Sequence, residues 1–190
     1  MLPTLVDGAP SREEALVLRL RRGEAAAVAE VFDLHGRAVR AFARRFVGDD
    51  AAADDLLQEV FVALPSVIRR WEERSSLRTF LIGIAVNHAR HHVRAAARRR
   101  AATERLAAEP GAHGTDPEQD ARRRELARAL QRALDELPLD QRAAFVLCEV
   151  EERTAAEVSV IVGAPEATVR TRLFHARKRL RVALEREGAR

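Results

Sequence analysis

The sequence lacks the residues that usually build β-structure. Tyrosine is absent, aromatic residues make up 4% of the 190 residues, and no run of alternating Val, Ile and Thr lies between glycine-rich turns. Strands are enriched in β-branched and aromatic residues, so this composition argues against a β-sandwich or β-barrel and predicts an all-α protein. The length also excludes a large catalytic barrel, which needs about 250 residues.

Cysteine and long apolar runs are scarce as well. Cys148 is the single cysteine, so no intrachain disulfide can form and a reducing compartment is expected. Its apolar neighbours predict a buried thiol rather than a catalytic one. The longest uncharged stretch, between Arg78 and Arg90, is shorter than the roughly 18–20 apolar residues of a membrane helix. Residues 1–10 do not resemble a secretory signal, so we expect a cytoplasmic protein without membrane insertion.

Apolar and charged residues are both abundant. Hydrophobic residues make up 47% and charged residues 33% of the chain, which is enough apolar material for a packed core and too much for wholesale disorder. Lys and Arg number 33 against 29 Asp and Glu, a net charge of +4. Because this surplus is small, the positions of the charges along the chain carry the information about partners.

Helical periodicity in the first half predicts a bundle of four helices. Ser11 and Glu14 have the spacing of a capping box, which predicts a first helix over about residues 12–22. A second helix ends at Gly48, a third contains Pro65 and should kink or break there, and a fourth becomes basic along its length. The apolar stripe of the second helix consists of Val28, Phe32, Val39, Phe42 and Phe46.

The helical pattern lapses in the middle of the chain. Two prolines and two glycines interrupt residues 99–121, where the neighbouring residues are small or charged. We therefore predict a tail and first helix over residues 1–24, a first domain over 25–98, a flexible linker over 99–121 and a second domain over 122–190. Fully extended, such a linker could span about 75 Å.

The clearest local motif lies near the C-terminus. Thr154 and Glu157 form a second capping box, Gly163 ends the short helix and Pro165 opens a longer one, which is the layout of a helix-turn-helix. Between Pro165 and Leu184 there are six Lys or Arg residues and one acid. Such a helix suits the major groove of DNA, where arginine can bind a guanine edge. The alternative is a solvated basic face on a terminal helix.

Acidic residues gather where the third predicted helix begins. Five acids and no base lie within eleven residues, just before Val60 and Phe61: Asp49, Asp50, Asp54, Asp55 and Glu59. The helix dipole favours carboxylates at an N-terminus, which explains the first two. Glu59, with its apolar neighbours, predicts a charged and apolar docking surface. Aspartate clusters also bind magnesium, but the sequence offers no second acidic cluster, so no metal site is expected.

Aromatic and amide side chains precede a run of arginines in the fourth predicted helix. Trp71, Phe80 and Asn87 could hold unstacked bases while the arginines follow a phosphate backbone. The alternative is that the two aromatic residues belong to the core. Three nearby histidines have no cysteine or carboxylate close by in the sequence, so they do not predict a zinc site. The basic run consists of Arg90, Arg94, Arg98, Arg99 and Arg100.

Short motifs follow one another in a characteristic order. They are GD at 48–49, ADDLLQEVF at 53–61, RTFL at 78–81, IAVN at 84–87, LP at 137–138, QR at 141–142 and the helix-turn-helix through FHAR at 174–177. In this order and spacing they resemble the bacterial extracytoplasmic-function (ECF) sigma factors of RNA polymerase. The resemblance covers about residues 25–100 and 124–185.

The resemblance implies a transcription initiation factor with two small domains, a sigma region 2-like helical bundle and a region 4-like helix-turn-helix. It implies RNA polymerase core enzyme, promoter DNA and an anti-sigma factor as partners. The residues matching the core-binding segment are Asp55, Leu56, Gln58, Glu59 and Phe61. Those matching the segment that opens the minus-10 element are Trp71, Ser76, Arg78, Phe80, Asn87, Arg90 and Arg94. Those matching the minus-35 reader are Thr168, Arg170, Thr171, Arg172, Phe174, His175 and Arg177.

Five positions depart from the family pattern, and at one of them Asp54 replaces glutamate conservatively. Phe80 replaces a common tryptophan, Gly83 a frequent arginine and His91 a frequent aspartate, so contacts around the minus-10 element are expected to differ from the usual set. His175 stands where arginine is common, which leaves the inner minus-35 base preference open. Two other functions compete with this interpretation: a helix-turn-helix regulator that is not a sigma factor, and a metal-dependent helical enzyme built on the aspartates. We expect no enzymatic activity, no cofactor and no metal.

Overall fold

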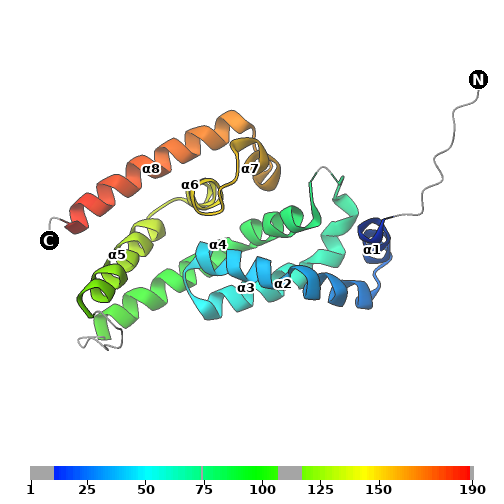
Figure 1. Ribbon diagram of the computed structural model, residues 1–190, viewed down its shortest axis with the longest axis horizontal. Coiled ribbons are helices and arrows are strands. Elements are labelled where there is room, and N and C mark those ends of the chain that lie inside the picture. The colour runs from blue at the N-terminus through cyan, green and yellow to red at the C-terminus, as the bar shows by residue number, and fades with distance from the viewer. Residues whose placement is uncertain (1–10, 74, 107–116, 189–190) are drawn as a thin grey trace, which may run out of the picture.

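The computed structural model describes residues 11–73, 75–106 and 117–188, and within these ranges every regular element is helical (Figure 1). The all-α prediction is therefore confirmed. The N-terminal domain contains α1 (Arg12–Arg21), α2 (Ala25–Val47), α3 (Asp50–Val67), the 3₁₀ turn η1 (Ile68–Arg70) and α4 (Leu77–Leu106). The C-terminal domain contains α5 (Pro117–Asp135), α6 (Leu139–Phe145), the π-helical turn η2 (Val146–Val150), α7 (Ala155–Val162) and α8 (Glu166–Gly188).

The N-terminal helices begin and end at the residues that the sequence marks. The Ser11 hydroxyl accepts a hydrogen bond from the Glu14 N–H at 3.2 Å, and the Glu14 carboxylate accepts one from the Ser11 N–H at 2.6 Å. Gly48 ends α2 with φ at 72°, in the left-handed region that glycine adopts without strain. Asp49 then caps α3 by accepting from the Ala52 N–H at 2.7 Å.

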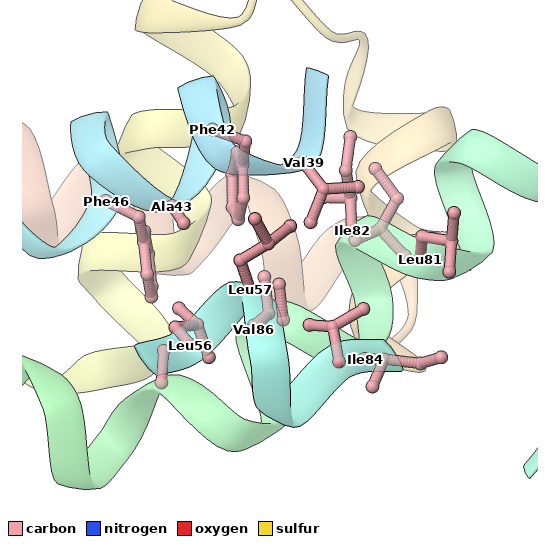
Figure 2. Packing of buried hydrophobic residues seen from close by; sticks show 14 of the residues in the cluster. Val39, Phe42, Ala43, Phe46, Leu56, Leu57, Leu81, Ile82, Ile84 and Val86 are labelled. Carbon is pink, nitrogen blue, oxygen red and sulfur yellow. The ribbon is translucent and has the colours of Figure 1, made fainter. Parts of the chain in front are cut away.

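The main core lies between α2, α3 and α4. Figure 2 shows Val39, Phe42 and Phe46 of α2 meeting Leu57 of α3 and Ile82 of α4 in one cluster. The rings of Phe42 and Phe46 stack with centroids 5.4 Å apart, and neither side chain is exposed. The apolar stripe predicted for the second helix is thus the core face of α2.

Two expectations for the bundle need correction. Phe32 belongs to the predicted stripe but is 45% exposed, because its ring lies at the rim of the core, edge-on to Phe61 at 5.0 Å. α3 does not end at Pro65; it continues to Val67 and passes into η1. Pro65 lies in the last turn of α3, close to where the helix changes pitch, so the missing N–H disturbs little of the helix.

The predicted linker over residues 99–121 is too long. α4 continues to Leu106 and α5 begins at Pro117, so the first and last parts of that range are helical; the rest of the prediction falls on residues 107–116, outside the described residues. Ion pairs from Arg99 to Asp49 at 2.9 Å and from Arg100 to Asp135 at 2.6 Å fix this part of α4 against neighbouring elements. The basic run is therefore an ordered helical segment.

The C-terminal domain has the predicted helix-turn-helix. Thr154 caps α7, accepting from the Glu157 N–H at 3.2 Å, and Gly163 ends α7 with φ at 63°. Pro138 lies at the N-cap of α6, as the predicted boundary requires. A small core joins α5 to α8 and consists of Ala133, Leu134, Leu137, Ala176 and Leu180.

The two domains pack against each other. Figure 1 shows α6 and α7 beside α4, and Leu147, Val158, Ile161 and Val169 belong to the same buried cluster as the N-terminal core. Part of the surface of each domain is therefore buried in this contact. Within the described ranges, no helix is long and apolar enough to cross a lipid bilayer.

Candidate nucleic-acid and protein interfaces

The acidic segment of α3 divides into paired and unpaired carboxylates. Asp49 is the N-cap of α3 and pairs with Arg99; Asp54 pairs with Arg40 of α2. These hydrogen bonds with arginine lower the pKa of both carboxyl groups, against the opposing effect of burial. Asp55 is exposed and forms no ion pair with another described residue. Most of the cluster therefore holds α2, α3 and α4 together, and Asp55 is left to face solvent.

An exposed ridge on α3 carries three of the five predicted docking residues. Asp55, Gln58 and Glu59 are exposed, and Val62, one turn further along, is 80% exposed. We call these four residues the docking ridge. Val62 was not among the predicted docking residues, although its spacing of four residues from Gln58 places the two on one helix face.

Two residues predicted to bind a partner point inward instead. Leu56 is fully buried and Phe61 is 8% exposed, with its ring against Phe32. Their place in the core means that they support the docking ridge from below rather than forming part of its surface.

Glu59 is tied to α4 by two histidines. Its carboxylate oxygens lie 3.0 Å from Nε2 of His92 and 3.4 Å from Nδ1 of His88. Burial, the largest single influence, acts to raise the pKa of Glu59, but the hydrogen bonds and charges of the two histidines together lower it. The His–Glu contact links the docking ridge to the helix that carries the predicted DNA-binding residues. Among the described residues, no group of three His, Cys, Asp or Glu side chains has the arrangement of a metal site.

The aromatic residues of the predicted minus-10 group lie together. The rings of Trp71 and Phe80 stack with centroids 5.5 Å apart; Trp71 is 8% exposed, and Phe80 is half-buried. Ser76 caps α4, accepting from the Thr79 N–H at 3.2 Å. Trp71 belongs to the buried core and Phe80 packs against it, and both rings border a cavity.

That cavity lies between the domains. It has a volume of about 420 Å³, and its walls include Trp71, Phe80 and Asn87 on one side and Val160 and Gly163 on the other. The remaining predicted residues of this group, Arg78, Arg90 and Arg94, are exposed along α4. We call Trp71, Phe80, Asn87, Arg90 and Arg94 the α4 face.

The helix α8 presents the predicted minus-35 residues on one side. Thr171, Phe174 and His175 are exposed, Phe174 by 63%, with the Phe174 and His175 rings edge-to-face at 5.5 Å. Thr168 is half-buried at the start of the helix, and the exposed Lys178 continues the same surface.

Three arginines of α8 are engaged with carboxylates. Arg172 donates to Asp140 of α6 at 2.8 Å, Arg177 to Glu149 of η2 at 2.6 Å, and Arg170 to Glu166 one turn earlier. Exposed pairs of this kind contribute about 0–1 kcal/mol each, so a phosphate or base could replace the carboxylate at low cost. The 28% exposure of the Arg172 side chain makes it the least accessible of the three.

Cys148 does not have the environment of a nucleophile. It is half-buried, and burial, together with the charge of Glu149, raises the pKa of its thiol. The prediction of a packing role rather than a catalytic one fits this environment, although the residue is less buried than expected.

Comparisons with known proteins match both domains. The family description "Sigma-70 region 2" matches residues 31–99, and "Sigma-70, region 4" matches residues 127–180. The chain is 33% identical over 156 residues to the "ECF RNA polymerase sigma factor SigC" of Mycobacterium tuberculosis, covering 77% of this chain and 83% of that protein. It is 28% identical over 182 residues to the "RNA polymerase sigma-H factor" of Pseudomonas aeruginosa, covering 92% and 94%.

Solved structures share the fold. The structure of CnrH in complex with the cytosolic domain of CnrY matches with a TM-score of 0.60 at 23% identity, covering 91% of this chain and 97% of that one. The sigma factor RpoE in complex with the anti-sigma factor NepR from Bartonella quintana matches with a TM-score of 0.53 at 25% identity, covering 83% and 96%.

Proposed function

The chain belongs to the ECF sigma factors and directs transcription initiation by RNA polymerase, and from this premise we propose how its surfaces divide the work. The docking ridge binds the core enzyme, the α4 face holds the melted minus-10 strand and α8 reads the minus-35 duplex. The observation that carries this proposal is that the exposed residues of the three surfaces lie on three different helices, α3, α4 and α8.

The docking ridge fits a basic and partly apolar protein surface. Asp55 and Glu59 offer carboxylates, Gln58 offers an amide, and Val62 adds an apolar side chain that water solvates poorly. A partner that pairs its Lys or Arg residues with Asp55 and covers Val62 would gain both charge complementarity and buried apolar area. The core polymerase is the partner that the family membership supplies.

The α4 face fits a single strand. Flipping a base out of the duplex costs a few kcal/mol, which stacking on an aromatic ring and hydrogen bonds to an amide can offset. Phe80 stacked on Trp71, with Asn87 on the same wall of the cavity, offers both kinds of contact. Arg90 and Arg94, exposed further along α4, would follow the phosphates.

The recognition helix fits the major groove of an intact duplex. Arg170, Thr171 and His175 lie near the N-terminal half of α8, the part of a recognition helix that contacts base edges. The Phe174 ring offers apolar contact to a thymine methyl group. Arg172 and Arg177 would leave their carboxylate partners for phosphates.

Membership of the family also points to an inhibitory partner. The matched structure of RpoE contains an anti-sigma factor, and we propose that a protein of this class binds the present chain. The chain itself catalyses no reaction, since the polymerase performs the chemistry, and it acts in the cytoplasm, where polymerase and promoters meet.

Co-elution with purified core polymerase tests the docking ridge. Asp55→Ala should weaken co-elution, while Asp50→Ala should not, since Asp50 is an exposed aspartate on the same helix but pairs with Arg44 at 2.9 Å. Equal binding by both variants would contradict the assignment. A symmetric dimer that binds palindromic DNA without polymerase would instead favour a regulator of another kind.

A further inference from the structure

The first helix is anchored in the bundle and ends at an arginine. Leu16, Val17 and Leu20 bury one face of α1 in the main core, each with 3% exposure or less. α1 precedes residues 31–99, which match sigma-70 region 2, so that match assigns it no role. Figure 1 shows α1 beside η1, the turn that leads from α3 towards α4. Arg21, the last residue of α1, is therefore held close to that turn.

Arg21 binds the loop between η1 and α4 at two points. Its Nη2 atom donates to the carbonyl oxygen of Trp71 at 2.7 Å and lies 2.9 Å from a carboxylate oxygen of Glu73. A guanidinium Nη atom carries two hydrogens, so it can donate to both acceptors at once. We call residues 71–76, of which residue 74 lies outside the described ranges, the η1–α4 loop. One side chain of α1 thus holds two residues of this loop.

Glu73 has a backbone conformation that needs such support. Its φ angle is 58°, in the left-handed region that residues other than glycine rarely adopt. A residue persists in that region only when its surroundings hold it there. An ion pair between exposed side chains contributes little by itself, and those of Arg21 and Glu73 are 33% and 45% exposed. The hydrogen bond to the Trp71 carbonyl adds a geometric constraint, so the two contacts together define the path of the chain.

The η1–α4 loop supplies one aromatic ring of the α4 face. Trp71 lines the cavity with Phe80 and Asn87, whereas the described residues of the cavity walls do not include Arg21. The Trp71 N–H donates to the carbonyl oxygen of Ile68 at 3.1 Å, and the Trp71 carbonyl accepts from Arg21. The backbone of Trp71 is thus held on both sides while its ring stacks on Phe80. Arg21 therefore acts on the α4 face through the loop.

We propose that Arg21 is a positioning residue for promoter opening: it holds the η1–α4 loop so that the stacked pair of Trp71 and Phe80 is ready to receive an unstacked base. A site that is already ordered avoids the entropy loss of ordering the loop when the strand binds. The inference rests on the proposed role of the α4 face, but the effect of Arg21 on Trp71 is measurable without polymerase or DNA.

Intrinsic fluorescence of the free, full-length chain tests the effect on the loop, because Trp71 is the single tryptophan. Its side chain is 8% exposed in the parent. After Arg21→Ala we expect emission at longer wavelength and stronger quenching by acrylamide, since a loosened loop admits water to the indole ring. Glu73→Ala removes one of the two contacts and should shift both readouts in the same direction by less. Unchanged emission and quenching in Arg21→Ala would overturn the proposal.

Arg19→Ala is the matched control. Arg19 lies on the same helix and also binds carboxylates, but its partners are Glu24 at 3.0 Å and Glu30 at 2.7 Å rather than the loop. Emission and quenching should therefore stay at the parent values. A shift as large as that of Arg21→Ala would overturn the assignment to Arg21. Circular dichroism identifies a variant that fails to fold; if Arg21→Ala does so, Glu73→Ala, which changes an exposed loop residue, decides.

Promoter binding by the assembled holoenzyme tests the role in strand capture. The probe is a promoter fragment, selected by transcription, whose minus-10 element is left unpaired. An abasic nucleotide replaces each non-template position of that element in turn. In the parent, one such replacement should weaken binding about fivefold to about 150-fold, which corresponds to a stacking contribution of about 1–3 kcal/mol at about 1.4 kcal/mol per tenfold change.

Comparison of the intact and abasic fragments separates positioning from general destabilisation. Arg21→Ala should weaken binding of the intact fragment but bind the sensitive abasic fragment about as well as the parent does, because the base contact is already missing there. Arg19→Ala should bind both fragments as the parent does. An equal loss by Arg21→Ala on both fragments, with Trp71 emission shifted, would overturn the role in strand capture. If no position is sensitive in the parent, the proposed role of the α4 face fails as well.

Discussion

The two domains hold themselves together in different ways. The N-terminal domain buries large side chains such as Phe42, Phe46 and Leu56 between three long helices. Among the described residues, the separate core of the C-terminal domain contains five buried residues, two of them alanines. Val158 and Ile161 of its helix-turn-helix are buried in the N-terminal cluster instead. Part of the apolar surface of the C-terminal domain is therefore buried against the N-terminal domain.

The predicted functional residues also differ between the two domains in how far they are buried. In the N-terminal domain Leu56, Phe61 and Trp71 are core residues as well as predicted site residues, so binding and folding share side chains there. In the C-terminal domain Thr171 and Phe174 are exposed and contribute little to any core. Substitutions should therefore damage stability in the first domain and recognition in the second.

Removing a core ring should have the largest effect on stability. Phe42→Ala should cost about 3–5 kcal/mol of unfolding free energy, because it deletes a buried ring and leaves a cavity. Phe174→Ala in the C-terminal domain should change it by less than about 0.5 kcal/mol, because that ring is 63% exposed. Urea denaturation followed by circular dichroism measures both, and a similar loss in the two variants would abolish the contrast.

Removing a recognition arginine should affect promoter choice rather than folding. Arg170→Ala should cost about 1–3 kcal/mol of discrimination between promoter and random DNA, if the residue binds a guanine with two hydrogen bonds. The comparison requires a promoter fragment selected by transcription and a fixed salt concentration. An equal loss of affinity for both DNAs would reassign Arg170 to a phosphate contact.

The capping boxes allow the same change to be made in each domain. Thr154→Ala removes the cap of α7 and should cost about 1 kcal/mol. Ser11→Ala removes the cap of α1, which lies at the periphery of the bundle, and should cost the same or less. Thermal unfolding of the two variants measures the difference. A larger loss for Ser11→Ala would mean that the cap of α1 contributes more to stability than the cap of α7 does.

Acid should produce the smallest of the expected effects. The pKa of Asp49 is lowered, mainly by its hydrogen bond with Arg99, so this carboxylate stabilises the fold above the usual carboxyl pKa. That contribution is lost as pH falls through the lowered value. Asp49→Asn keeps a good N-cap but removes the charge, so its urea midpoint should fall less than that of the parent between about pH 7 and pH 3. If the urea midpoints of the parent and the variant fall equally over this pH range, the Asp49 charge contributes nothing to the stability of the fold.

Much of the local structure was predictable because it depends on neighbouring residues. The capping residues Ser11 and Thr154 and the glycines at 48 and 163 act within one helical turn, so the pattern identifies them directly. The family resemblance, based on ordered motifs, also predicted the two domains and their function.

Long-range contacts were not predictable in the same way. The helical part of the supposed linker depends on ion pairs between Arg100 and Asp135, which are 35 residues apart. The burial of Leu56 and Phe61 depends on which face of α3 meets α2 and α4. The exposure of Val62 is the reverse case: an apolar residue in an apolar run gives no sign that its face is left open.

Transcription in vitro tests the central claim most directly. Purified protein would be added to core polymerase and a library of genomic fragments, and the start sites of the transcripts would be mapped. The account predicts initiation from a defined set of fragments that share two sequence elements, and much less of it with the Asp55→Ala variant. Transcripts that do not depend on the protein, with no co-elution of the two, would contradict it.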